Sequence, residues 1–175
     1  FGTGWTLRIN SMQISESCEP GSNWNYITNS GGLFSNFRVK ESKPHTVTIT
    51  YPNGKTDEFS TVLSPESSII PLEGRPLTIS YEPKRGTYSK LEILEDNTVW
   101  LFTEGDNKAV LYKDNLTDTY NPNRYKLTTE DGTIYVINQS TGLESITDVN
   151  GNTINFDATG IKSSSGKGIE FEKDS

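Results

Sequence analysis

The chain has 175 residues, of which 31% are hydrophobic and 22% charged, with a formal net charge of −7. This charge repels phosphate backbones and no cluster of Lys and Arg offsets it, so we expect no nucleic-acid partner. No apolar run approaches the roughly 18 residues of a membrane span, so no membrane insertion is expected. The first residue is Phe1 rather than Met, which indicates an excised or processed fragment.

The single cysteine and the single histidine exclude several kinds of site. Cys18 excludes an intramolecular disulfide, and with His45 as the one histidine a Cys2His2 zinc site is excluded as well. His45 precedes the run TVTIT, an edge position typical of a structural residue, and Cys18 lies in a polar loop. We therefore predict no catalytic residue, no metal site and no cofactor.

Apolar and polar residues alternate with a period of two along most of the chain. No window of 11 residues shows the 3.6-residue stripe of an amphipathic helix, so the sequence predicts an all-β fold. Two stretches depart from the alternation: a loop over 15–32 rich in Ser, Asn and Gly, and a Pro-punctuated segment over 64–83. The predicted strands, in chain order, are centred on residues 5–9, 46–51, 77–81, 91–93, 99–103, 134–137, 154–156 and 169–171.

Three dipeptides between these strands have the composition of tight hairpin turns. They are Asn53-Gly54, Asp131-Gly132 and Asn150-Gly151. Asn-Gly and Asp-Gly suit type I′ turns, in which two successive residues adopt positive φ. Several such turns in succession predict an antiparallel meander of hairpins.

The C-terminal part carries an internal repeat. Gly132 and Gly151 are 19 residues apart, and the pair Thr141-Gly142 recurs 18 residues later at Thr159-Gly160. A unit of about 20 residues is one two-stranded element, too small to bury its own apolar face, so it must stack on its neighbours. Apolar residues stand three and five positions after Gly132, Gly151 and Gly166: Tyr135 and Ile137, Ile154 and Phe156, Ile169 and Phe171.

We therefore divide the chain into an irregular β lead-in over 1–127 and β-hairpin repeats over 128–175. The expected architecture is a curved antiparallel β-strip, either open or sandwich-like, that forms a fragment of a larger repeat shell.

The segment DGTIYVINQSTGLESITDVNGNTINFD resembles the repeat of RHS/YD-repeat proteins, and the opening FGTGWTL resembles the segment that precedes such arrays. The Tyr-Asp pair that gives the repeat its name is replaced here by Phe156-Asp157 and Phe171-Glu172. The chain also lacks Asp-Pro, so the family's self-cleavage is not carried over. The resemblance implies a non-catalytic segment of a bacterial secreted or cell-surface protein, whose partners are further repeats of the same chain around a C-terminal variable or toxin domain.

Two alternatives use chemistry within the chain. Trp24 and Tyr26 lie in a polar segment, where a ring stacks on a sugar while Asn23 and Asn25 bond its hydroxyls, so the alternative function is a carbohydrate-binding β module with a polysaccharide partner. A competing interpretation places both rings against a neighbouring part of the strip. Asp148, Asn150 and Asn152 partly match a calcium loop, but the glycine is displaced and the bidentate Glu is missing, so turn capping is favoured.

A polysaccharide hydrolase remains as a further hypothesis. Such an enzyme requires two carboxylates at a matched distance across a cleft, and the 23 acidic residues offer many pairs with none singled out by the sequence.

Overall fold

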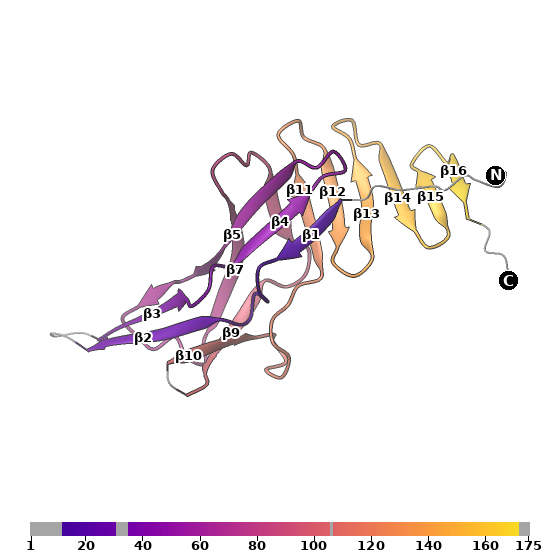
Figure 1. Cartoon of the computed structure of the whole chain (residues 1–175). Coiled ribbons are helices and arrows are strands. Elements are labelled where there is room, and N and C mark those ends of the chain that lie inside the picture. Colours follow the sequence, from indigo (N-terminus) through magenta and orange to yellow (C-terminus); the bar gives the residue numbers. More distant parts are fainter. Residues whose placement is uncertain (1–11, 31–34, 106, 172–175) are drawn as a thin grey trace.

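The computed structural model describes residues 12–30, 35–105 and 107–171, and all secondary structure in these ranges is β (Figure 1). Two antiparallel sheets account for every strand. The all-β meander prediction is therefore confirmed. The predicted strand around Trp5, Leu7 and Ile9 lies outside the described residues.

The first sheet has the order β1-β4-β5-β7-β9-β10-β2-β3-β6 and is strongly curled. Neighbours in this order include strands far apart in the sequence, such as β10 and β2. Its strands are β1 (Gln13–Glu16), β2 (Trp24–Ser30), β3 (Ser35–Glu41), β4 (Thr46–Thr50), β5 (Thr56–Ser64), β6 (Ser67–Ser68), β7 (Pro76–Pro83), β9 (Thr98–Thr103) and β10 (Lys108–Tyr112).

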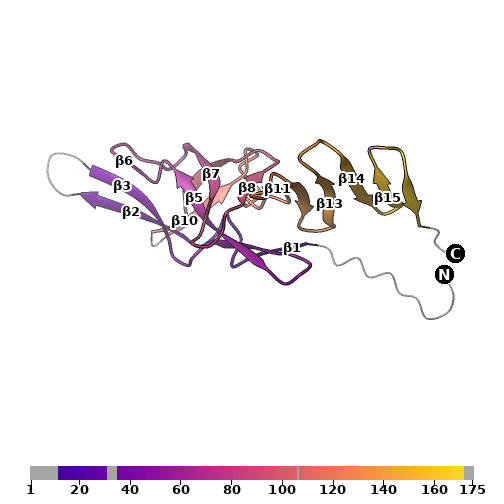
Figure 2. The ribbon, with the colours of Figure 1, turned by 90° about the horizontal axis from the view of Figure 1, so that it is seen from above.

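The second sheet is a flatter strip with the order β16-β15-β14-β13-β12-β11-β8. From β11 to β16 each strand pairs with its neighbours in sequence, and the strip leads away from the first sheet one hairpin at a time (Figure 2). Its strands are β8 (Lys90–Ile93), β11 (Arg124–Thr128), β12 (Ile134–Asn138), β13 (Gly142–Thr147), β14 (Thr153–Asp157), β15 (Gly160–Ser163) and β16 (Gly168–Glu170).

The core lies between the first sheet and the near half of the strip. Alternate residues of each strand point inward, as a period-two pattern requires, so that Val47, Phe59 and Tyr125 are at most 1% exposed. β1 is an edge of the first sheet and lies against β12 and β13. Tyr51 and Tyr135 meet edge to face across the same interface, with ring centroids 6.5 Å apart.

The predicted boundary between residues 127 and 128 falls at the end of β11. β11 and β12 form one hairpin, and β8 and β11 of the lead-in region belong to the strip. Leu127 on one side of the boundary and Ile137 on the other are both fully buried in the same core. The lead-in and the first repeats therefore share a core.

The turns differ from the predicted type I′. Gly54, Gly132 and Gly151 have φ near +82°, but none of the preceding residues, Asn53, Asp131 and Asn150, has positive φ. In each turn the glycine amide donates to the residue three positions back, and that residue's amide donates to the carbonyl that follows the glycine. This is a type I turn closed by a left-handed glycine bulge, which needs one positive φ instead of two.

The turn between β15 and β16 uses the same geometry at Gly166, whose amide donates to the carbonyl of Ser163. The opposite rim of the strip is built differently. There the side-chain Oδ1 atoms of Asn138 and Asp157 each accept two backbone amides of the following loop, before Gly142 and Gly160 start the next strands. The predicted turn residues thus occupy two chemically distinct rims.

The predicted loop over 15–32 is partly wrong, because Trp24–Ser30 forms β2. Asn25 lies between Trp24 and Tyr26 in this strand and pairs with Lys40 of β3, and Asn29 near the strand end pairs with Asn36. In the Pro-punctuated segment, β7 confirms the strand predicted over 77–81, and its two prolines stand at its two ends, where a missing amide costs least.

Candidate functional site

Trp24 and Tyr26, the two rings predicted to bind a sugar, are core residues. Trp24 is 4% and Tyr26 7% exposed, because both alternate inward along β2. Trp24 stacks on His45 with ring centroids 4.2 Å apart and its Nε1 donates to the carbonyl of Pro20 at 2.7 Å. The hydroxyl of Tyr26 accepts from the amide of Leu72 at 3.0 Å. A sugar would stack on these rings only if this core opened.

The two amides predicted to accompany the rings have local roles. Asn23 adopts a φ of +61° and its Nδ2 donates to Ser22 Oγ at 2.9 Å, so it shapes the entry to β2. Asn25 is half-buried within the β2–β3 ladder.

His45 and Cys18 are not positioned as a nucleophile and base. Nε2 of His45 lies 2.6 Å from the carbonyl of Ser22, which makes Nε2 the donor, and Nδ1 faces a carboxylate oxygen of Glu41 at 3.5 Å. Cys18 Sγ instead contacts the carbonyl of Pro44 at 3.8 Å. His45 is 2% exposed and packs as a structural residue.

Asp148 caps its own turn. Its Oδ1 accepts from the amides of Asn150 and Asn152 at 2.9 Å each, and its Oδ2 accepts from the side chain of Asn152 at 2.8 Å. These bonds hold the pKa of Asp148 below its ordinary value. Within the described ranges no group of three or more His, Cys, Asp and Glu side chains is placed to hold a metal ion.

The sheets are joined by a polar seam around Glu16 that the sequence did not indicate. The Tyr125 hydroxyl contacts both the carboxylate of Glu16 and the carbonyl of Pro122, and Gln139 Nε2 lies 3.3 Å from that hydroxyl. Burial raises the pKa of Glu16, although the bonds from Tyr125 and Gln139 oppose the rise. Because Glu16 and Tyr125 are 109 positions apart, no local pattern predicts their contact.

A second polar cluster surrounds Asp57, which is 1% exposed. Its Oδ2 accepts from Tyr51 and Ser89 at 2.6 Å each, and Lys55 Nζ lies 3.5 Å from its Oδ1. Burial raises the pKa of Asp57, but these partners outweigh that effect and lower it. Oδ2 is fully bonded, whereas the buried Oδ1 has no hydrogen-bond partner among the described residues and faces only the Lys55 ammonium.

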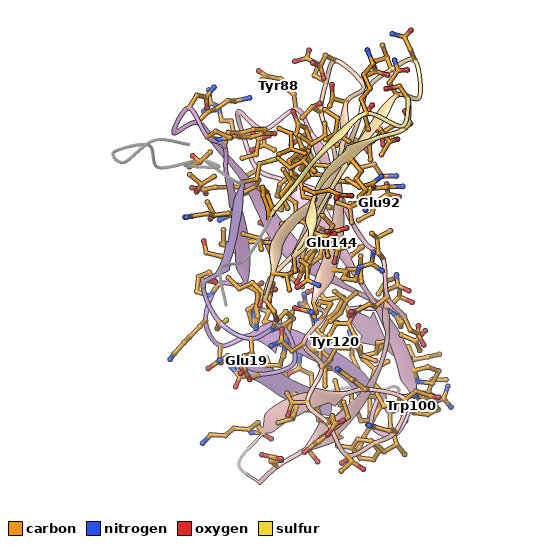
Figure 3. The ribbon with its side chains drawn as sticks, turned by 90° about the vertical axis from the view of Figure 1, so that its right-hand side faces the viewer. Glu19, Tyr88, Glu92, Trp100, Tyr120 and Glu144 are labelled. Carbon is orange, nitrogen blue, oxygen red and sulfur yellow. The ribbon has the colours of Figure 1, made fainter. Side chains whose placement is uncertain are left out.

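The outer face of the strip carries ion pairs. Glu92 lies between Lys90 and Lys126 at 2.9 and 2.8 Å, and Glu144 accepts two bonds from Arg124, the shorter at 2.7 Å. Figure 3 shows Glu92 and Glu144 on the same side of the strip. Exposed ion pairs of this kind contribute little to the stability of the fold. Each carboxylate is positioned by its cation and, within the described ranges, does not face a second carboxylate across a cleft.

The strip contains a hollow of about 860 Å³ where β13 and β14 diverge. A bulge opposite Val136 and Ile137 shifts β13, and the last paired residues of the two strands are Ser145 and Asn155. Leu143 and Phe156 line the hollow beyond this pair.

The feature that distinguishes the far half of the strip is an uncovered apolar face. Pairing places Ile154 beside Ile146 and Tyr135, and Ile169 beside Ile161 and Phe156, all on the side that faces the first sheet. Ile154 is 41% and Ile169 55% exposed. β16 is also the edge of the sheet, so its outer backbone groups have no strand partner among the described residues.

Comparison with known proteins gives no assignment. No protein-family model matches the sequence, and no match was found among the curated proteins or the solved structures. The resemblance to RHS/YD repeats therefore remains a prediction. The described residues also contain no helix with the length and apolarity needed to cross a membrane.

Proposed function

We propose that this chain is a non-catalytic structural segment of a β-strip that is continued by further hairpin repeats, of the kind found in RHS/YD-repeat proteins. The observation that carries the proposal is the far half of the strip, β14 to β16, with its exposed Ile154 and Ile169 and its open edge. A neighbouring hairpin added at β16 pairs that edge, as each strand from β12 to β15 pairs with the next.

The repeated turn geometry also supports this function. Three turns on one rim of the strip, at Gly132, Gly151 and Gly166, share one hydrogen-bond pattern, and their spacing sets successive hairpins side by side. Further units with the same turn geometry can be added to the strip one after another, and repeat proteins are extended in this way. In such an array the parent protein is a bacterial secreted or surface protein, and the partners of this segment are its own repeats.

Extension of the strip tests the proposal. A chain carrying a second copy of residues 142–171 after Phe171 is compared with one carrying a scrambled copy. Amide hydrogen exchange at β16 is the readout, because edge amides exchange fast and paired ones slowly. We expect at least about tenfold slower exchange at β16 with the true copy.

Equal exchange in the two extended chains would count against the proposal. In the parent protein, limited proteolysis supplies an independent check, since ready cleavage beside Lys162 within an intact array is incompatible with a tiled strip.

A further inference from the structure

The two sheets end at different places, and the offset creates a step. The first sheet stops at β1, which lies over β12 and β13, whereas the strip continues beneath and beyond it through β14, β15 and β16. The step therefore has a side, which is the edge of β1 that no described strand pairs, and a floor, which is the apolar face of the far strands. Figure 1 shows the far strands extending past β1. This site is independent of the β16 edge that the proposed function uses.

Among the described residues, the side of the step presents main-chain groups that no strand pairs. The amide of Ser17 donates to the carbonyl of Thr46, so in β1 the backbone groups of Gln13, Ser15 and Ser17 face β4. Because these directions alternate along a strand, the N–H and C=O groups of Ile14 and Glu16 face the open edge. An edge of this kind pairs with an added strand.

The floor of the step is apolar and continuous with the buried core. Ile154 and Ile169 are exposed, and Phe156 and Ile161 beside them are half-buried. The same face is covered under β1, where Ile137 is fully buried. A strand added to β1 would extend the existing packing of sheet on sheet by one more strand.

The size of the floor identifies the occupant. Three strands about 4.8 Å apart and about four residues long offer on the order of 200 Å². A stable contact between folded proteins buries about 800 Å² on each partner, so a second folded copy would be held poorly by this floor. A single extended segment gains the backbone bonds of β1 in addition to the floor.

The polar positions of that segment face away from the floor. Glu144, Asp157, Glu170 and Lys162 each directly follow an apolar residue of the floor side, so their side chains lie on the opposite face of the strip, and Asp148 caps its own turn. The strip therefore favours neither charge at those positions, and polar side chains there stay in solvent.

We propose that the step between β1 and the face of β14–β16 binds an extended segment of a partner protein, in which apolar side chains alternate with polar ones. The segment pairs with Ile14 and Glu16 of β1 and points its apolar side chains at Ile154 and Ile169. Side chains of directly paired residues lie on the same face of a sheet, so the apolar residues are also those whose amides bond to β1.

This register gives a matched pair of probes. The probe is a fluorescein-labelled nine-residue peptide of alternating valine and lysine, titrated into the full chain and followed by anisotropy. N-methylation of the valine amides removes the bonds to β1, whereas N-methylation of the lysine amides alters the opposite edge. We expect the valine-methylated peptide to bind at least about tenfold more weakly, and the lysine-methylated peptide within about twofold of the parent.

Two variants test the floor in the same assay. Ile154→Lys places a charge on the floor, and Asn155→Lys places the same charge one residue away on the opposite face of β14. We expect at least about tenfold weaker binding for Ile154→Lys and a change within about twofold for Asn155→Lys. In two-dimensional NMR spectra, the amides of Ile14 and Glu16 should shift more than those of Gln13 and Ser15.

Three results would overturn the proposal. They are the absence of saturable binding by the full chain, equal affinity of the two methylated peptides, and equal losses for the two lysine variants. The last two would indicate attraction of a basic peptide to an acidic surface without strand pairing.

Discussion

The near and far halves of the strip have the same pattern and different burial. Tyr135 and Ile137 in β12 stand where Ile154 and Phe156 stand in β14, three and five residues after a left-handed glycine. Five residues after the glycine, Ile137 is fully buried whereas Phe156 is half-buried; three residues after it, Tyr135 is half-buried whereas Ile154 is 41% exposed. The difference is the layer above: β1 lies over β12, and the first sheet does not extend over β14. Alternation thus determines which way a side chain points, and a second layer determines whether it is buried.

The largest loss of stability is expected for a substitution at Ile137, in the covered half of the strip. Ile137→Ala removes a side chain that is 0% exposed and leaves a cavity between the sheets. We expect the free energy of unfolding, measured by urea denaturation, to fall by about 2–5 kcal/mol. A loss below about 1 kcal/mol would mean that the near half of the strip is not packed as described.

Two glycine variants come next. Gly132 and Gly151 both have a φ of +83°, so alanine is strained at either position. An added Cβ at Gly132 would lie 2.9 Å from Val149 Cγ1, whereas at Gly151 no atom lies within 4 Å. We expect thermal denaturation to show a loss of about 1–2 kcal/mol for Gly151→Ala and a larger loss for Gly132→Ala. Equal losses would show that Val149 moves aside freely.

The seam that holds β1 on the strip predicts a smaller, pH-dependent effect. Because the pKa of Glu16 is raised in the folded protein, protonation favours folding. The contribution of Glu16 to stability is therefore fully present below its unfolded pKa and is lost as the pH rises through its folded pKa.

Glu16→Gln removes this titration. We expect the variant to gain stability relative to the wild type at pH 7 and to lose that advantage near pH 4, with a change smaller than that of either glycine variant. Asp57 titrates in both proteins with the opposite sign, since its pKa is lowered, and serves as the common background. Urea midpoints that move in parallel across this pH range would contradict the assignment.

The smallest effect is expected at the far end of the strip. Ile169→Ala removes a side chain that is already 55% exposed, so the free energy of unfolding should change by less than about 0.5 kcal/mol. Comparing the losses of stability in Ile169→Ala and Ile137→Ala directly tests whether the two halves of the strip differ in burial. A loss at Ile169 similar to that at Ile137 would indicate that the far face is covered in solution.

Much of the fold follows from local pattern. Alternation at Val47 and Ile49 or at Ile154 and Phe156 predicts strands, and the glycines at 132, 151 and 166 predict the order of the hairpins. The turn type was wrong because Asn-Gly and Asp-Gly also suit a type I turn with a glycine bulge. The predicted loop over 15–32 was partly wrong because four of the seven residues of β2 are Asn, Thr or Ser, a polar composition that conceals a strand.

The contacts at the candidate sites could be predicted from the sequence much less well than the fold. Trp24 is surrounded by polar neighbours in the chain, yet its ring is stacked on His45, 21 positions away. The contact of Tyr125 with Glu16 and the step beside β1 both depend on where the two sheets meet. That placement is set by long-range packing, which a period of two residues does not encode.

The neighbour-to-neighbour pairing of the strip has a consequence for how the chain folds. Each hairpin from β11 to β16 needs only residues a short distance away, so it closes a small loop at little entropic cost and can form soon after it is synthesised. β10 joins β2 with Lys108 opposite Asn25, which requires a far larger loop to close. The hairpins of the strip should therefore form early in refolding, and formation of the curled sheet should limit the refolding rate.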